Sequence, residues 1–148
     1  MATNYIPKGY QHVIPYLAVP GAAKIIPFAQ KVLGGEVIYK MERPDGALAH
    51  AEIRIRDTVV MIGTPEQGPG TPGMLMVYLP DVDDAFRRAI AAGATAVKEP
   101  ADQFYGDRTA MVKDACGNQW YLATHKEDVS PQEMDRRAAE YVKKQGAK

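Results

Sequence analysis

The stretch FYGDRTAMVKDACGNQWYL, residues 104–122, decides the fold that we predict for this chain. Its pattern predicts a β-hairpin, with extended segments at 108–113 and 119–124 joined by a tight turn. Gly117 and Asn118 belong to the two residue types that most readily adopt the positive φ of such a turn. The hairpin gathers side chains that either meet a ligand or form its own core and turn: Phe104, Tyr105, Asp107, Arg108, Asp114, Trp120 and Tyr121.

The residues before the hairpin predict a strand followed by a helix. Residues 74–79 form an apolar strand, and Asp81 after it suits the N-cap of a helix. Apolar residues then recur at helical spacing over 82–92. We expect a short strand at 96–98 and a loop at 99–107 before the hairpin begins.

The first part of the chain predicts the same opening. Residues 12–19 (HVIPYLAV) indicate a strand, and Pro15 favours an edge position for it. Residues 22–33 indicate a helix that ends at Gly34. Pro27 falls inside this range, so we expect it to kink the first turns of the helix.

Three strands follow this first helix. We expect them at 36–41, 48–56 and 58–62, with a Pro-Asp-Gly turn between the first two. The middle strand alternates strongly, which is typical of a strand with two different faces. Its more polar face carries Leu48, His50, Glu52, Arg54 and Arg56.

The two parts of the chain therefore repeat one order of elements at a spacing of about 60 residues. We predict a single α+β domain over 1–148, made of duplicated βαβββ modules whose mixed sheets form a cup. The first module covers about 12–63 and the second about 74–125, with a Pro/Gly-rich linker at 64–73 between them. The positions that repeat in letter are Pro20 and Pro80, Ala29 and Ala89, Val37 and Val97, and Gly46 and Gly106.

A C-terminal helix is predicted at 130–145, outside the repeat. Ser130 and Glu133 form a capping box, and Pro131 suits the first helical position. Met134, Ala138, Tyr141 and Val142 make an apolar stripe on this helix. The stripe packs on the domain or on a partner subunit, or the helix stays solvated.

Composition excludes several classes of protein. The chain has 148 residues, 46% of them hydrophobic, and a formal net charge of zero, which argues against a nucleic-acid or anionic-membrane surface. No apolar run has the length of a transmembrane helix, and the first residues lack the pattern of a signal peptide. Cys116 is the single cysteine, so we expect a reducing cytoplasm and a turn role for this residue.

A duplicated βαβββ chain of this size resembles the vicinal-oxygen-chelate superfamily, which includes glyoxalase I, bleomycin-resistance proteins, extradiol dioxygenases and fosfomycin-resistance enzymes. The likeness is strongest to its PhnB-like branch and covers nearly the whole chain. It implies that each module curls its sheet into a cup and that pairs of modules enclose a pocket. The residues that carry it are Ile14-Pro-Tyr-Leu17, Val32-Leu-Gly-Gly35, His50-Ala-Glu52, Ala92-Gly-Ala94, Phe104–Arg108, Asp114–Trp120 and Thr124–Pro131.

The resemblance also implies where a metal would bind. Metal-using members take ligands from the first and last strand of each module, and the matching positions here are Ile14, Met61, Met74 and Tyr121. Isoleucine and methionine lack the oxygen or imidazole nitrogen that Zn, Ni, Mn or Fe needs. We therefore expect no metal cofactor. The alternative is a divalent metal held by an unexpected set such as His12, His50 and Glu52.

We predict a ligand-binding set of His50, Glu52, Tyr105, Arg108, Trp120 and Tyr121, and assign no catalytic residue. His50 and Glu52 share a strand face, where they transfer a proton or are simply solvated. Arg108 holds an anionic group of a ligand, or forms a salt bridge with a nearby aspartate. The aromatic residues stack on a planar ligand or fill the core. His125 is predicted to be a surface residue.

The function predicted from these features is metal-free binding of a small molecule, sequestering a drug or metabolite in an adaptable pocket with methionine in its walls. The alternative is a divalent-metal-dependent lyase, isomerase or dioxygenase of the same superfamily. A third reading is an interaction module with a closed pocket that dimerises through its tail helix. We expect a small-molecule ligand and a homodimer, with no nucleic acid and no membrane as partner. Whether modules pair within a chain or across two chains is left open.

Overall fold

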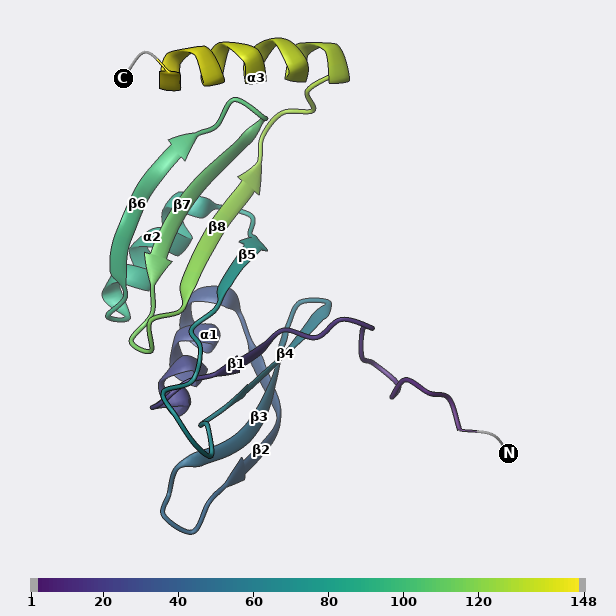
Figure 1. The fold of residues 1–148 in the computed structure, drawn as a ribbon, viewed down its shortest axis with the longest axis vertical. Helices are drawn as coiled ribbons and strands as arrows, with labels where there is room; N and C mark the ends of the chain where they lie inside the picture. Colours follow the sequence, from purple (N-terminus) through teal and green to yellow (C-terminus); the bar gives the residue numbers. More distant parts are fainter. Residues whose placement is uncertain (1–2, 147–148) are drawn as a thin grey trace.

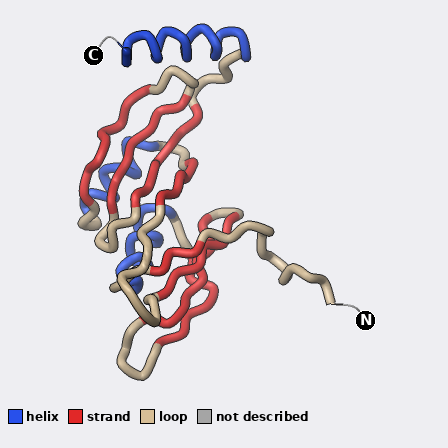
Figure 2. The backbone as a smooth tube through the Cα atoms, in the orientation of Figure 1, coloured by secondary structure: helices blue, strands red, loops and turns tan. Residues whose placement is uncertain are grey.

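The computed structural model describes residues 3–146 and contains two four-stranded sheets (Figures 1 and 2). The first sheet has the order β1-β4-β3-β2 and the second the order β5-β8-β7-β6. In each sheet the first strand is parallel to the last one, and the other neighbours are antiparallel. This shared order confirms the predicted α+β fold with a duplicated βαβββ unit.

The elements follow the predicted sequence with a few changes of boundary. The strands of the first sheet are β1 (Tyr16–Ala18), β2 (Glu36–Glu42), β3 (Leu48–Ile55) and β4 (Thr58–Gly63), and those of the second are β5 (Met74–Tyr78), β6 (Thr95–Asp102), β7 (Asp107–Lys113) and β8 (Gln119–His125). The helices are η1 (Ala22–Lys24), α1 (Ile25–Leu33), α2 (Val82–Ala91) and α3 (Pro131–Gly146).

The predicted hairpin is β7 and β8, which pair from Asp107 with His125 to Lys113 with Gln119. Gly117 takes a positive φ of 89° in the turn. Asn118, by contrast, contributes through its side chain, whose Oδ1 accepts a hydrogen bond of 2.8 Å from the Gly73 amide. The turn is thereby tied to the end of the linker that precedes β5.

The start of the first helix differs from the prediction. A short 3-10 turn, η1, precedes α1, so α1 begins at Ile25. Pro27 is then the third residue of α1, where a backbone N–H has no partner within the helix. The expected kink assumed an α-helix that starts at residue 22, whereas at its observed place in α1 the missing N–H of this proline costs no hydrogen bond within the helix.

Three strand predictions also need correction. β1 starts at Tyr16 rather than at residue 12, after the proline at position 15. Leu48 is buried, unlike the polar residues predicted to share its strand face, because the register between β2 and β3 shifts beside it. β6 extends to Asp102, well into the predicted loop, and tolerates Pro100 as an edge strand with an irregular register.

One hydrophobic core serves both sheets. Helices α1 and α2 contact each other, with α1 against β2 and β3 and α2 against β6, β7 and β8. Helix α1 also contacts β8, where the ring of Trp120 lies 5.6 Å from that of Phe28. Arg88 of α2 also donates to the Lys31 and Val32 carbonyls at the end of α1. The two modules thus share their helical sides, and apolar side chains stay exposed on strands of both sheets.

The tail helix α3 lies across the tip of the second sheet (Figure 1). Arg137 binds Glu127 and the Phe104 carbonyl, and the Tyr141 ring lies 4.8 Å from that of Phe104. Within the described residues of α3, 131–146, no side chain is fully buried. Among residues 3–146 no helix is long and apolar enough to cross a membrane.

Candidate functional site

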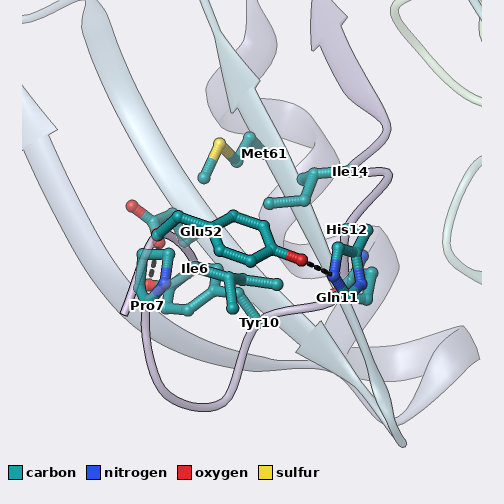
Figure 3. A pocket seen from close by; sticks show the side chains of 9 residues that line it. Ile6, Pro7, Tyr10, Gln11, His12, Ile14, Glu52 and Met61 are labelled. Atoms are coloured by element: carbon teal, nitrogen blue, oxygen red, sulfur yellow. Dashed lines mark hydrogen bonds between the residues drawn. The ribbon is translucent and has the colours of Figure 1, made fainter. Parts of the chain in front are cut away.

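A segment before β1, residues 5–14, runs beside the first sheet, and we call it the N-terminal strap (Figure 3). Side chains hold it to the sheet. The Gln11 amide donates to the Val59 carbonyl at 2.7 Å and accepts from the Val59 N–H at 3.1 Å. Because β1 first pairs with β4 at Met61, Val59 lies beyond the end of β1. The Gln11 side chain therefore satisfies a part of the β4 edge that β1 leaves open.

A cavity of about 380 Å³ lies between the strap and the first sheet, and we call it the strap pocket. Its size falls at the small end of the range for ligand sites in proteins, roughly 300–1,000 Å³. Strand β3 contributes Glu52 and β4 contributes Met61. The strap contributes the rest of the wall: Tyr5, Ile6, Pro7, Tyr10, Gln11, His12 and Ile14.

A chain of hydrogen bonds ends on the Glu52 carboxylate. The Tyr10 hydroxyl donates to Oε1, and Nε2 of His50 lies 3.1 Å from Oε2. The Tyr16 hydroxyl lies 3.0 Å from Nδ1 of the same histidine. The hydrogen bond from Tyr10 lowers the pKa of Glu52, with a further lowering from His50. The same bond raises the pKa of Tyr10, so the carboxylate is ionised and the phenol protonated at neutral pH.

The structure therefore brings together His50 and Glu52, two of the predicted site residues. It also adds residues that the sequence did not single out. Tyr10 and Tyr5 come from the N-terminal segment, and the Tyr5 hydroxyl lies 2.9 Å from Nε2 of His12. The available signal was the aromatic content of this otherwise polar segment.

The residues of the site do not fit the metal centre that the resemblance implies. Ile14 and Met61, two of the matching positions, both line the strap pocket and present carbon and thioether sulfur. Met74 and Tyr121 lie on β5 and β8 of the second sheet. Over residues 3–146 no group of three or more His, Cys, Asp or Glu side chains is placed to hold a metal ion.

The other predicted residues lie on the second sheet or in its core, away from the strap pocket. The Arg108 guanidinium binds Asp83 through Nε at 2.7 Å and Nη2 at 2.9 Å, and also Asp102. Trp120 is 1% exposed and donates from Nε1 to Asp114 at 2.9 Å. Tyr121 lies beneath the Lys98 ammonium, 5.7 Å from the ring centre. Burial raises the pKa of Tyr105, which packs edge-on against Phe104.

A second polar cluster lies at the end of β7 and β8. The His125 ring contacts two carboxylates, the buried one of Asp107 at 2.8 Å and the exposed one of Asp128 at 2.7 Å. Tyr78 donates to the other oxygen of Asp107 at 2.6 Å. The Asp107 contact, and then that of Asp128, raise the pKa of His125. The sequence predicted His125 as a surface residue, and its side chain is about half exposed, but this pairing was missed.

A larger cavity, about 540 Å³, opens between the edge strand β5 and the turn that joins β3 to β4. Its walls are mainly apolar, with Arg56, Asp57 and Thr58 at the turn. Trp120 forms part of one wall, so this predicted site residue reaches a cavity although it is buried. The lining residues are Pro15, Ile55, Arg56, Asp57, Thr58, Val60, Leu75, Met76, Val77, Tyr78 and Trp120.

The sequence matches a protein-family model and known proteins. Residues 9–122 match the family model described as Glyoxalase/Bleomycin resistance protein/Dioxygenase superfamily. An uncharacterized protein of Mycobacterium bovis is 35% identical over 146 residues, covering 90% of this chain and 93% of that protein. A Mycobacterium tuberculosis protein, also described as uncharacterized, has the same identity with 84% of its length covered.

Solved structures share the fold. TioX from Micromonospora sp. ML1 superposes with a TM-score of 0.67 at 25% identity, covering 78% of this chain and 98% of TioX. A glyoxalase/bleomycin resistance protein/dioxygenase family enzyme from Burkholderia phytofirmans PsJN gives a TM-score of 0.60 at 19% identity, covering 76% of this chain and 95% of that one.

Proposed function

Since this chain belongs to the Glyoxalase/Bleomycin resistance protein/Dioxygenase superfamily, we propose that it is a metal-free member that binds an organic small molecule and sequesters a drug or metabolite. The observation that carries the proposal is the strap pocket. Two positions where the family resemblance expects metal ligands, Ile14 and Met61, line this pocket as apolar side chains.

The chemistry of the pocket supports binding rather than bond cleavage. Tyr5 and Tyr10 present aromatic surface, and Met61 adds a flexible thioether that adapts to different shapes. The His50–Glu52 pair, which the sequence suggested for proton transfer, has its hydrogen bonds committed to Tyr10 and Tyr16. A ligand in this pocket gains from stacking and burial, with Glu52 as a fixed polar anchor.

Isothermal titration against a panel of planar antibiotics and aromatic metabolites tests the proposal. We expect at least one compound to bind with micromolar affinity, and Tyr10→Ala to weaken it about tenfold by removing aromatic wall and the strap's bond to Glu52. Tyr141→Ala, on α3, is the control and should bind as the wild type does. Absence of binding across the panel, or binding indifferent to Tyr10→Ala, contradicts the proposal.

Metal analysis of protein purified without a histidine tag tests the cofactor part separately. The donor chemistry of Ile14 and Met61 leads us to expect substoichiometric Zn, Ni, Mn and Fe, with ligand binding unchanged by a chelator. A stoichiometric metal whose removal abolishes binding would support instead a metal-dependent lyase, isomerase or dioxygenase.

We further propose a homodimer formed through the exposed strand β5. Met74, Met76 and Tyr78 on this edge strand are 61%, 46% and 54% exposed, and no charged residue interrupts it. An uncharged apolar edge is a template for pairing with a second chain. Light scattering should give a dimer mass for the wild type and a monomer mass for Met76→Lys. Val142→Lys on α3 is the control, and a monomer for that variant alone would point to the tail helix instead.

Two finer proposals concern branch and location. We place the chain in the PhnB-like branch on the segments that carry the resemblance, among them His50-Ala-Glu52 and the hairpin turn. We also propose a cytoplasmic location, supported by a single cysteine, Cys116, that is free. Fractionation of cells that express the untagged protein checks the location, and recovery outside the cytoplasm contradicts it.

A further inference from the structure

Glu52 lies at the wall of the strap pocket without an arginine or lysine as its hydrogen-bond partner. In this it resembles the buried Asp107, which a tyrosine and a histidine contact, and it differs from several more exposed carboxylates. Asp83 is paired with Arg108, and Glu127 and Glu133 with Arg137. Among the described residues, by contrast, the hydrogen-bond partners of Glu52 are the Tyr10 hydroxyl and the His50 imidazole. A hydroxyl orients a carboxylate without cancelling its charge.

Hydrogen bonds hold the Glu52 carboxylate in one place. The Tyr10 hydroxyl donates to Oε1, and the His50 ring bridges Oε2 and the Tyr16 hydroxyl. The carboxylate is thereby fixed in position at the pocket wall.

The rest of the strap pocket suits a positive charge. Among its nine lining residues, all within the described chain, there is no Lys or Arg. Arg54, two residues after Glu52 on β3, does not line the pocket, and its guanidinium binds the Gly9 carbonyl at 3.2 Å. Tyr5 and Tyr10 both line the pocket, and aromatic rings supply the electron-rich surface on which organic cations are held. Figure 3 shows Tyr10 beside Glu52.

We propose that the strap pocket selects an organic cation, an amine or quaternary ammonium on a small apolar or aromatic body. The cationic group lies against Glu52 and the tyrosine rings, and the apolar body lies against Ile6, Ile14 and Met61. An anion such as a carboxylate or phosphate ester of the same size is rejected, because Glu52 repels it and no Lys or Arg side chain lines the described pocket. This inference rests on the proposed function and adds the charge of the ligand to it.

The test compares three probes of one shape. Phenyltrimethylammonium carries the positive charge, tert-butylbenzene is its neutral isostere, and benzenesulfonate, with a tetrahedral anionic group on the same ring, is the anionic member. Binding is followed by NMR shift changes of the strap and β3 amides in full-length protein. We expect the cation to bind at least about tenfold more tightly than the neutral probe, because a charge pair and cation–π contacts are added, and the anion not to bind.

Glu52→Gln separates charge from shape. This variant should weaken the cation about tenfold and leave the neutral probe unchanged. Glu99→Gln, an exposed glutamate on β6, makes the same chemical change in the other sheet and should behave as the wild type does. Unchanged affinity for the neutral probe also reports that the variant pocket is folded.

Each other outcome has a distinct meaning. Equal affinity for cation and neutral probe, or preference for the anion, overturns the charge inference and leaves the proposed binding function standing. No shift of strap or β3 amides with any of the three probes, in the wild type and at concentrations up to probe solubility, overturns the charge inference as well. The titration panel then decides the binding function on its own.

Discussion

Single side chains that accept several hydrogen bonds fix the geometry of the second sheet. Asp114, buried in the β7–β8 turn, accepts from the Cys116 and Asn118 amides, from the Asn118 side chain and from the Trp120 indole. Asp45, in the exposed turn between β2 and β3, accepts from one amide, that of Ala47. The two turn aspartates therefore differ both in burial and in the number of hydrogen bonds that they accept.

Asp114→Ala should lower the free energy of unfolding by about 3 kcal/mol, because it leaves buried donors without an acceptor. The Trp120 indole and the Asn118 amide lose their partner directly. Asp45→Ala is the matched control and should cost about 0.5 kcal/mol at its exposed position. Urea unfolding followed by Trp120 fluorescence measures both, and equal costs for the two variants would contradict the assignment.

His125 should make the stability of the protein depend on pH. Its folded-state pKa is raised above the ordinary value of 6.5 because Asp107 and Asp128 accept from its ring. The stabilisation is therefore fully present below about pH 6.5 and fades as the pH rises through the folded-state value.

His125→Gln tests this dependence through thermal melts between pH 5.5 and 8.5. The difference in melting temperature between wild type and variant should be largest at the acidic end and shrink as the pH increases. A difference that stays constant over this range would show that the contact with Asp107 contributes without a change in protonation.

At the scale of elements, α3 is attached to the body more loosely than any other helix described in the structure. Its contacts are polar ones through Arg137 and one aromatic contact between Tyr141 and Phe104. Helices α1 and α2, by contrast, each bury several side chains in the shared core. Exposed ion pairs of the kind that line α3 contribute little to stability.

Truncation after Ser130, which removes α3, should therefore leave the two sheets folded. We expect the melting temperature of the remaining chain to fall by no more than a few degrees, since about 1 kcal/mol corresponds to roughly 2–8 °C for domains of this size class. Circular dichroism on full-length and truncated protein measures it. Loss of the cooperative transition on truncation would show that α3 is part of the core.

The sequence predicted most of these elements because their signals are local. Alternation predicted β3, apolar spacing and Asp81 predicted α2, and Gly117 marked the hairpin turn. The misses came from longer-range effects. Pairing with β7 extends β6 past Pro100, and the local sequence of β6 gives no sign of this pairing.

At the scale of the whole molecule, one core joins two modules of the same order. The residues that join them lie on the facing helices and on β8, where Phe28 meets Trp120. A core shared in this way couples the stabilities of both sheets, because neither can lose the contact alone.

Phe28→Ala should destabilise the first and second sheets together, by about 3–5 kcal/mol, through the cavity it leaves beside Trp120. Tyr39→Ala, an exposed aromatic on β2, is the control and should change stability little. Hydrogen exchange measured by NMR reports each sheet separately. Faster exchange in the first sheet alone would contradict a shared core.

The candidate site was predictable only in part. His50 and Glu52 were found because two polar residues two positions apart share a strand face. The strap was not found, since Tyr10 reaches Glu52 across 42 residues of sequence and Gln11 reaches Val59 across 48. Arg108 and Trp120 are of residue types that often bind ligands. In the structure they contact Asp83 and Phe28 instead, and these partners lie in other elements.

The attachment of the strap by side chains has a consequence for how the protein should be produced. Tyr5 forms part of the pocket wall, and each added residue can extend the chain by about 3.5 Å, so a fusion tag before the strap can reach Glu52. A polyhistidine tag there would supply imidazoles to a carboxylate and create an artificial metal site. Helix α3 lies far from the first sheet (Figure 1), so a tag placed after α3 leaves the pocket as it is.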